Sequence, residues 1–282
     1  GGAVPQTGNL SDFGGQFERQ AGFELDIVND AEERIEFSYE DTQTSENTGV
    51  TAAEKLVSQD GLPMVFAGLS SSVAIAIAES VAIPNETLMA TGGTSSAITE
   101  LEDDNWVFRT SPPSTLQAQA LATMIADDGN SDVSIIYLND DFGTAVKDEL
   151  VASLDTLGVN VTDSVGYASG KSSYSSQLNQ AASGDPDAIA FVTFPQGFIV
   201  MAKEAFEMGL KDQVAYYGIE NIKGSDVRDN LDAQTISGMS GTQPSPPTER
   251  DSFQRFISEN EERFDRTPSI WEAYYFDSAM VM

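Results

Sequence analysis

Met64-Val65-Phe66-Ala67-Gly68-Leu69-Ser70-Ser71-Ser72 runs from an apolar strand pattern through a glycine into three successive hydroxyl residues. A helical pattern over 73–83 follows directly, so the stretch predicts a strand, a corner and a helix. Such a corner leaves backbone N–H groups unpaired at the positive end of the helix dipole, and serine is a natural helix cap. The three serines therefore either cap the helix, which is the simpler interpretation of this segment alone, or hold a small anion.

The same alternation of strand and helix patterns recurs along the whole chain, which is typical of βαβ units and parallel sheets. The predicted fold class is therefore α/β. Strands are predicted over 2–5, 34–39, 64–67, 87–90, 133–138, 159–165, 188–194, 214–218 and 238–242. Helices are predicted over 14–29, 48–59, 73–83, 114–127, 143–157, 174–182, 197–208, 250–264 and 269–282.

Two polar breaks, at 127–132 and 243–248, divide this series into two doubly wound, Rossmann-like lobes. The helical tail beyond the second break brings no strand, so we assign 1–130 and 244–282 to lobe one and 131–243 to lobe two. In open α/β sheets ligands bind at the carboxyl ends of the strands, so we expect the ligand in an interlobe cleft there. The last helical stretch ends without a cap, and we expect a chain truncated at its C-terminus.

Acidic residues outnumber basic ones by 45 to 14, which gives a formal net charge of −31. Nucleic acid is therefore excluded as a partner, because binding phosphates needs a lysine- and arginine-rich surface. An acidic coat on a well-packed protein is typical of proteins that work in high salt, where the self-repulsion is screened. We therefore predict a halophilic source.

The chain contains no cysteine and no histidine, which removes disulfides, thiolate nucleophiles, the usual general base and the commonest metal ligand. We expect no enzyme activity, no metal and no cofactor; an α/β enzyme that works with carboxylates and a metal is a less favoured alternative. No apolar run is long enough to cross a bilayer. The N-terminal residues contain no signal peptide, and we expect a processed or trimmed chain.

The residues that follow the predicted strands define two complementary sets. Lobe one offers hydroxyls and backbone N–H groups that suit an anion, in the serine corner and in Thr91-Gly92-Gly93-Thr94-Ser95. Lobe two offers Glu220 for a cation and aromatic residues for an apolar body. Together the two sets predict a site for a zwitterion with a side chain. Glu220 is also one of 45 acidic residues, and its position alone is better explained by a solvated surface side chain.

The aromatic residues have an equally simple alternative, because Phe13, Phe142 and Phe194 also fit the core. Polar Asp140 and Asp141 precede Phe142, so we expect it to be the most exposed of the three. Thr91 and Thr94 also fit turn or cap positions. Arg109 is expected to anchor the edge of lobe one through an ion pair rather than to contact ligand.

At these corners the chain resembles the branched-chain amino acid (Leu/Ile/Val) binding proteins of ABC transporters, which have the type I periplasmic-binding fold. The similar stretches follow one another in family order over the full length. They are Val4-Pro5-Gln6-Thr7-Gly8 with Phe13-Gly14, Ala52-Ala53-Glu54-Lys55-Leu56-Val57, Gly68 to Ser72, Phe108-Arg109-Thr110-Ser111-Pro112, Asp140-Asp141-Phe142-Gly143 and Tyr217-Gly218-Ile219-Glu220.

This resemblance implies which residues bind ligand. The ligand carboxylate is expected on Ser70, Ser71, Ser72, Gly92 and Thr94, and the ammonium on Glu220. Phe13, Phe142 and Phe194 are expected to close over the ligand. The family usually has tyrosine where this chain has Phe142, so one polar contact is missing.

The resemblance also implies a function, namely capture of a small amino acid or a related amide for an ABC importer. The expected partners are the permease subunits, and the expected location is extracytoplasmic, with a possible lipid anchor upstream. A sensory ligand-binding domain of a receptor or regulator has the same fold and is the main alternative. Urea, amides and aromatic acids are bound on this fold as well.

Overall fold

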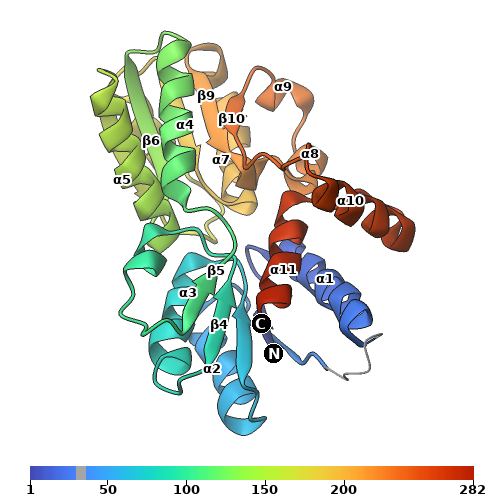
Figure 1. The fold of residues 1–282 in the computed structure, drawn as a ribbon. Coiled ribbons are helices and arrows are strands. Elements are labelled where there is room, and N and C mark those ends of the chain that lie inside the picture. Colours follow the sequence, from blue (N-terminus) through green and yellow to red (C-terminus); the bar gives the residue numbers. More distant parts are fainter. Residues whose placement is uncertain (30–35) are drawn as a thin grey trace. The chain divides into compact units, whose positions relative to one another are not determined.

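The computed structural model describes residues 1–29 and 36–282, which form two compact units; Figure 1 labels many of their elements. Unit 1 comprises Gly1–Pro112 and Pro244–Met282, and unit 2 comprises Pro113–Gln243. Each unit is built around its own parallel sheet, so the predicted α/β class with two Rossmann-like lobes is confirmed.

Unit 1 contains a parallel sheet whose described strands run in the order β2-β1-β3-β4-β5. The chain passes from one strand to the next through helices, as parallel pairing requires. Its elements are β1 (Gly2–Val4), α1 (Ser11–Asn29), β2 (Tyr39–Asp41), α2 (Glu46–Glu54), the π-helical η1 (Lys55–Gln59), β3 (Met64–Ala67), α3 (Ser71–Ile77), the π-helical η2 (Ala78–Ala82), β4 (Leu88–Thr91), the 3₁₀-helical η3 (Ser96–Glu100), β5 (Val107–Arg109), α10 (Asp251–Phe264) and α11 (Ile270–Val281).

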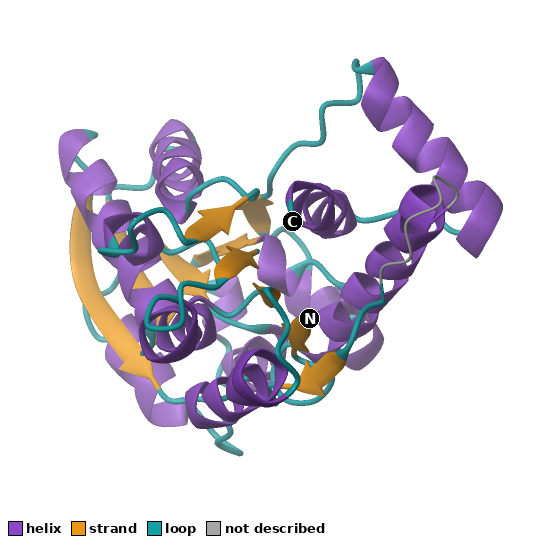
Figure 2. Cartoon of the chain, turned by 60° about the horizontal axis from the view of Figure 1, so that its bottom comes forward, coloured by secondary structure: helices purple, strands orange, loops and turns teal. Residues whose placement is uncertain are grey.

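The strands of unit 1 are apolar on both faces, because helices cover both sides of the sheet (Figure 2). Ala3 packs into the core formed with α2 and α3, while its neighbour Val4 packs against α1 and α11 on the other face. Successive side chains of a strand point to opposite faces, so buried neighbours on one strand necessarily serve two cores. The tail after Pro244 therefore supplies one of the layers of unit 1.

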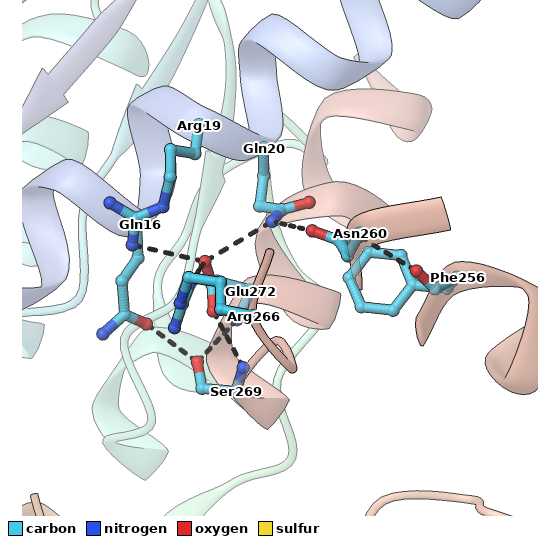
Figure 3. Close-up of polar contacts among 8 residues, drawn as sticks. All are labelled: Gln16, Arg19, Gln20, Phe256, Asn260, Arg266, Ser269 and Glu272. Atoms are coloured by element: carbon cyan, nitrogen blue, oxygen red, sulfur yellow. Dashed lines mark hydrogen bonds and ion pairs between the residues drawn. The ribbon is translucent and has the colours of Figure 1, made fainter. Parts of the chain in front are cut away.

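A buried carboxylate joins the helices of that layer (Figure 3). Glu272 on α11 is fully buried and accepts hydrogen bonds from the backbone N–H of Ser269 at 2.8 Å and from Arg266. Arg19 on α1 lies 3.4 Å from the same carboxylate. On α1, Gln20 donates to Asn260 of α10 at 2.7 Å. This polar cluster thus links α1, near the start of the chain, to the consecutive helices α10 and α11 at its end.

Unit 2 contains a second parallel sheet, whose described strands run in the order β10-β9-β8-β6-β7. All five residues of the central strand β8 are buried, as expected for a strand covered on both faces. The elements are α4 (Ser114–Asp127), β6 (Asp132–Leu138), α5 (Asp141–Thr156), β7 (Asn160–Tyr167), α6 (Ser175–Ala182), β8 (Ala188–Val192), α7 (Pro195–Glu207), η4 (Leu210–Asp212), β9 (Ala215–Ile219), η5 (Glu220–Ile222), α8 (Ser225–Asn230), α9 (Ala233–Ile236) and β10 (Ser240–Thr242).

The first boundary between the units differs from the expected position at 127–132. It lies between Pro112 and Pro113, so that α4 belongs to unit 2, where it packs against α5, β9 and β10. The polar stretch at 127–132 is a tight turn between α4 and β6, with Gly129 in the left-handed region at φ 84°. The second boundary, between Gln243 and Pro244, falls within the expected 243–248.

Candidate functional site

The serine corner, Ser70 to Ser72, lies where β3 gives way to α3, as its pattern predicts. Ser70 is the helix N-cap, and its Oγ accepts a hydrogen bond from Val73 N at 3.5 Å. Ser71 Oγ accepts from the backbone N–H of Thr94 at 3.2 Å and of Ser95 at 3.1 Å. The capping interpretation is thus correct for Ser70, while Ser71 ties the start of α3 to the loop after β4. In these bonds both oxygens are acceptors, which leaves their O–H protons to donate.

The loop after β4 is held against the serine corner by further hydrogen bonds. Gly92 N donates to Gly68 O at 2.9 Å, and the hydroxyl of Thr91 donates to the same carbonyl at 3.1 Å. Gly93 N in turn donates to the Thr91 hydroxyl at 3.0 Å. Ser70, Ser71, Ser72, Gly92 and Thr94 therefore gather at the carboxyl ends of β3 and β4, which are neighbours in the sheet of unit 1.

Arg109 braces this loop from the neighbouring strand β5. Its Nη1 donates to Ser95 O at 2.7 Å, and its Nη2 donates to the hydroxyl of Thr99. These bonds go to a carbonyl and a hydroxyl, in place of the ion pair expected from the sequence. Arg109 thus supports the residue next to Thr94.

Two Phe-Gly pairs occupy equivalent corners, one in each unit. Phe13-Gly14 lies in the first turn of α1, and Phe142-Gly143 lies in the first turn of α5. A Cβ atom on Gly14 would lie 2.4 Å from Pro5 O, and one on Gly143 would lie 1.9 Å from Leu138 O. Glycine is required at both positions, because the helix starts directly against the carbonyl groups of the preceding turn or strand end. The preceding phenylalanine is therefore placed next to a strand end in each case.

The exposure of the three aromatic residues differs from the expected order. Phe142 is only 4% exposed and stacks on Phe194, with ring centroids 5.5 Å apart and an interplanar angle of 14°. Phe194 is 6% exposed. Phe13 is the partly exposed member and meets Trp271 edge to face at 6.4 Å. Phe142 was expected to be the most exposed, but the stack within unit 2 covers it.

Glu220 begins η5 directly after β9 and is partly accessible. Its Oε2 accepts a hydrogen bond from the side-chain amide of Gln117, which also donates to Thr242 O at 3.1 Å. The dense surroundings remove water from the carboxylate and raise its pKa to about 7, although the bond from Gln117 lowers it. Glu220 is therefore poised between its neutral and charged forms near neutral pH.

A pocket of about 510 Å³ adjoins Glu220 within unit 2. Its lining is largely apolar, and its polar members are Glu220, Lys223, Arg228, Ser240, Thr242 and Gln243. Such a pocket suits an apolar group attached to a charged end. The apolar part of the lining is formed by Phe198, Ile222, Val227, Ile236, Met239 and Gly241.

Gln117 and the apolar lining of this pocket were missed by the sequence analysis, which considered only residues directly after strands. Gln117 lies within the first turn of a helix and is 103 residues away from Glu220 in the chain. Because Gln117 is far in sequence from the predicted corners, no local pattern marked it as a site residue. Ile222 directly follows the predicted corner Ile219-Glu220-Asn221, so a wider window around that corner would have included it.

Of the side chains described within 1–29 and 36–282, no three acidic ones lie close enough together to hold a metal ion. In the same ranges no helix has both the length and the apolar character needed to cross a membrane.

Comparison with known proteins assigns the family. The sequence model of the periplasmic binding protein family matches residues 1–282, and the chain therefore belongs to this family. A substrate-binding protein of the chemotactic signal transduction system of Halobacterium salinarum, BasB, is 30% identical over 143 residues. That match covers 48% of this chain and 34% of the relative, about a third of its length.

Solved structures show the same fold. The leucine-binding protein LivK of Thermotoga maritima superposes with a TM-score of 0.88 at 19% identity, over 99% of this chain and 80% of that protein. LivJ of Streptococcus pneumoniae, solved with isoleucine, gives a TM-score of 0.85 at 16% identity, over 99% and 81%. A solute-binding protein of Rhodopseudomonas palustris in complex with benzoate gives 0.83 at 15% identity, over 99% and 78%. The expected type I periplasmic-binding fold is confirmed.

Proposed function

We propose that this protein is the extracytoplasmic solute-binding component of an ABC importer and captures a small amino acid with an apolar side chain, or a related amide. The two units close over the ligand and deliver it to the permease, as in hinge-type binding proteins. Membership of the periplasmic binding protein family supports this function class and this location. A lipid anchor upstream belongs to the same proposal.

The observation that carries the proposal is the pairing of opposite chemistries in the two units. Unit 1 presents Ser70 and Ser71 hydroxyls that can donate to a carboxylate, supported by Ser72, Gly92 and Thr94. Unit 2 presents Glu220, whose hydrogen-bond donor is a neutral amide and whose charge is therefore left for an ammonium group. Phe13 and the Phe142–Phe194 stack would contact the ligand side chain.

The assignment of Glu220 is tested by calorimetric titration with L-leucine at pH 8 in molar KCl. Glu220→Gln keeps the shape of the side chain and removes the charge, so we expect roughly 10- to 100-fold weaker binding. The matched control is Glu149→Gln, which alters an acid that accepts a bond from the exposed Gln119. The control should bind leucine like the unaltered protein, and equal losses in both variants would refute the assignment.

A sensory role is the second candidate, because the Halobacterium salinarum relative belongs to a chemotactic signal transduction system. Import and sensing would use the same ligand site. They differ in the protein that the ligand-bound form contacts, which is a permease for import and a transducer for sensing. Neighbouring genes for a permease and an ATPase support import, whereas a neighbouring transducer gene supports sensing.

A further inference from the structure

Gln117 makes two hydrogen bonds at the carboxyl ends of strands in the unit 2 sheet, the end where Glu220 lies. One amide nitrogen donates to Glu220 Oε2 and to the backbone carbonyl of Thr242. Glu220 follows the end of β9, and Thr242 is the last residue of β10, its neighbour in the sheet. The amide group therefore ties α4 to the ends of two adjacent strands.

The position of Gln117 leaves the pocket side of Glu220 open to a ligand. Glu220 and Thr242 line the pocket, whereas Gln117 is absent from its lining. An amide N–H holds a carboxylate oxygen without neutralising it, unlike a lysine or arginine in the same place. A carboxylate fixed in this way keeps its charge available for a second donor that arrives from the pocket.

No charged side chain described around Glu220 takes over the hydrogen bond that the Gln117 amide donates to its carboxylate. β9, β10 and the α4 residues before Asp127 carry no charged side chain. Lys223 and Arg228 line the same pocket and are exposed, and Lys223 donates to Gln243 Oε1. On α7 the charged residues are Lys203, Glu204 and Glu207, and Glu204 accepts a bond from Tyr174 N.

We propose that Gln117 is a positioning residue for Glu220: its amide fixes the carboxylate and favours its charged form, so that an ammonium group can bind there. This inference rests on the proposed function, in which Glu220 receives the ligand ammonium. It adds a residue that acts on ligand binding through Glu220.

The direct test follows the Glu220 carboxyl by NMR in protein labelled with ¹³C at the glutamate carboxyl carbon, with no ligand present. The resonance is assigned by its loss in Glu220→Gln. In the unaltered protein the pKa is about 7. Gln117→Leu removes a donor that favours the charged form, so the midpoint should rise by about one pH unit. Gln119→Leu, the same change on the same helix at an exposed glutamine, should leave it unchanged.

The second measurement is L-leucine affinity at pH 7 and at pH 9. A midpoint one unit higher leaves about a tenth of the carboxyl charged at pH 7, against a half, so Gln117→Leu should bind roughly fivefold more weakly there. At pH 9 Glu220 is charged in both proteins, so their affinities for leucine should differ less than at pH 7. A structural role alone would instead weaken binding equally at both pH values.

An unchanged midpoint in Gln117→Leu, or an equal loss at both pH values, overturns the proposal. If Gln117→Leu does not fold, Gln117→Met takes its place with a side chain of similar length, and failure of both to fold assigns Gln117 a purely structural role and also overturns it. If the unaltered protein does not bind leucine, the proposed function fails for this ligand, while the carboxyl titration still decides the role of Gln117.

Discussion

The buried carboxylate of Glu272 holds together helices from the two ends of the chain in unit 1. It is fully buried and accepts hydrogen bonds from Arg19 and Gln20 on α1, from Arg266 in the segment before α11, and from the backbone N–H of Ser269. The Ser269 side chain also completes a capping box with Glu272 at the start of α11. One carboxylate thus orders a helix start and pairs with two cations.

Glu272→Gln should destabilise the protein, because it leaves both arginines without their partner. Breaking a buried pair costs about 3 to 5 kcal/mol, and we expect about 3 kcal/mol because the two arginine side chains are 37% and 38% exposed. The free energy of unfolding in urea measures the effect. Glu262→Gln, on the exposed face of α10, is the control and should change it by less than about 0.5 kcal/mol. Equal stability of the two variants would show that Glu272 is not a structural centre.

At the scale of elements, Ser71 links the start of α3 to the loop that leads into η3. Its oxygen accepts two backbone N–H groups, from Thr94 and Ser95, and the residue is 2% exposed. Ser71→Ala leaves both groups buried without a partner, which should cost about 2 kcal/mol. Ser258→Ala removes a hydroxyl from the exposed face of α10 and should cost little. Thermal unfolding of the two variants compares them, and similar melting temperatures would mean that water replaces the Ser71 oxygen.

Local sequence predicted the elements wherever a buried face or a helix cap marks them. The predicted strand over 64–67 and helix over 114–127 have the observed bounds, and most other elements differ by a few residues. β5 was missed because Val107, Phe108 and Arg109 are at most partly buried and form a strand only by pairing with β4. α8 and α9 were missed because both are short, and α8 is also mostly polar. Of the predicted strand over 34–39, residues 34 and 35 lie outside the described residues, 36–38 form no strand, and β2 begins only at Tyr39.

Some features of the candidate site could also be predicted from local sequence, and others could not. The loops after β3 and β4 could be found from the sequence because parallel strands end at one edge of a sheet. The burial of Phe142 could not, since it depends on Phe194, a residue of another βα unit. The contact of Gln117 with Glu220 also depends on how α4 packs on β9 and β10. Long-range packing, rather than local pattern, determines these features.

At the scale of the whole molecule, both boundaries between the units lie beside prolines. Pro112 and Pro113 flank the first boundary, and Pro244, at the second boundary, begins the return of the chain to unit 1. Proline ends regular structure on either side, because it lacks an N–H and restricts the residue before it. The polar stretch at 127–132 has a similar composition to a linker but closes a turn inside unit 2, so composition alone misplaced the first boundary.

The charge of the whole chain gives the last prediction. With a net charge of −31, the acidic residues repel one another most strongly in the compact state. The Debye length falls from about 10 Å at 0.1 M salt to about 3 Å at 1 M, so salt should remove most of this repulsion. We therefore expect the melting temperature to rise by at least several degrees between 0.1 M and 2 M KCl. The similarity to a Halobacterium salinarum protein agrees with this expectation.

Salt also strengthens burial by being excluded from protein surfaces, so the screening effect needs its own control. Sucrose at matched osmolality supplies exclusion without ions and should raise the melting temperature much less than KCl. Lowering the pH toward the sequence pI of about 4.1 should reduce the dependence on KCl, because protonated carboxyl groups no longer repel. A melting temperature that stays constant from 0.1 M to 2 M KCl, or that rises equally in sucrose, would show that the acidic coat does not serve stability in salt.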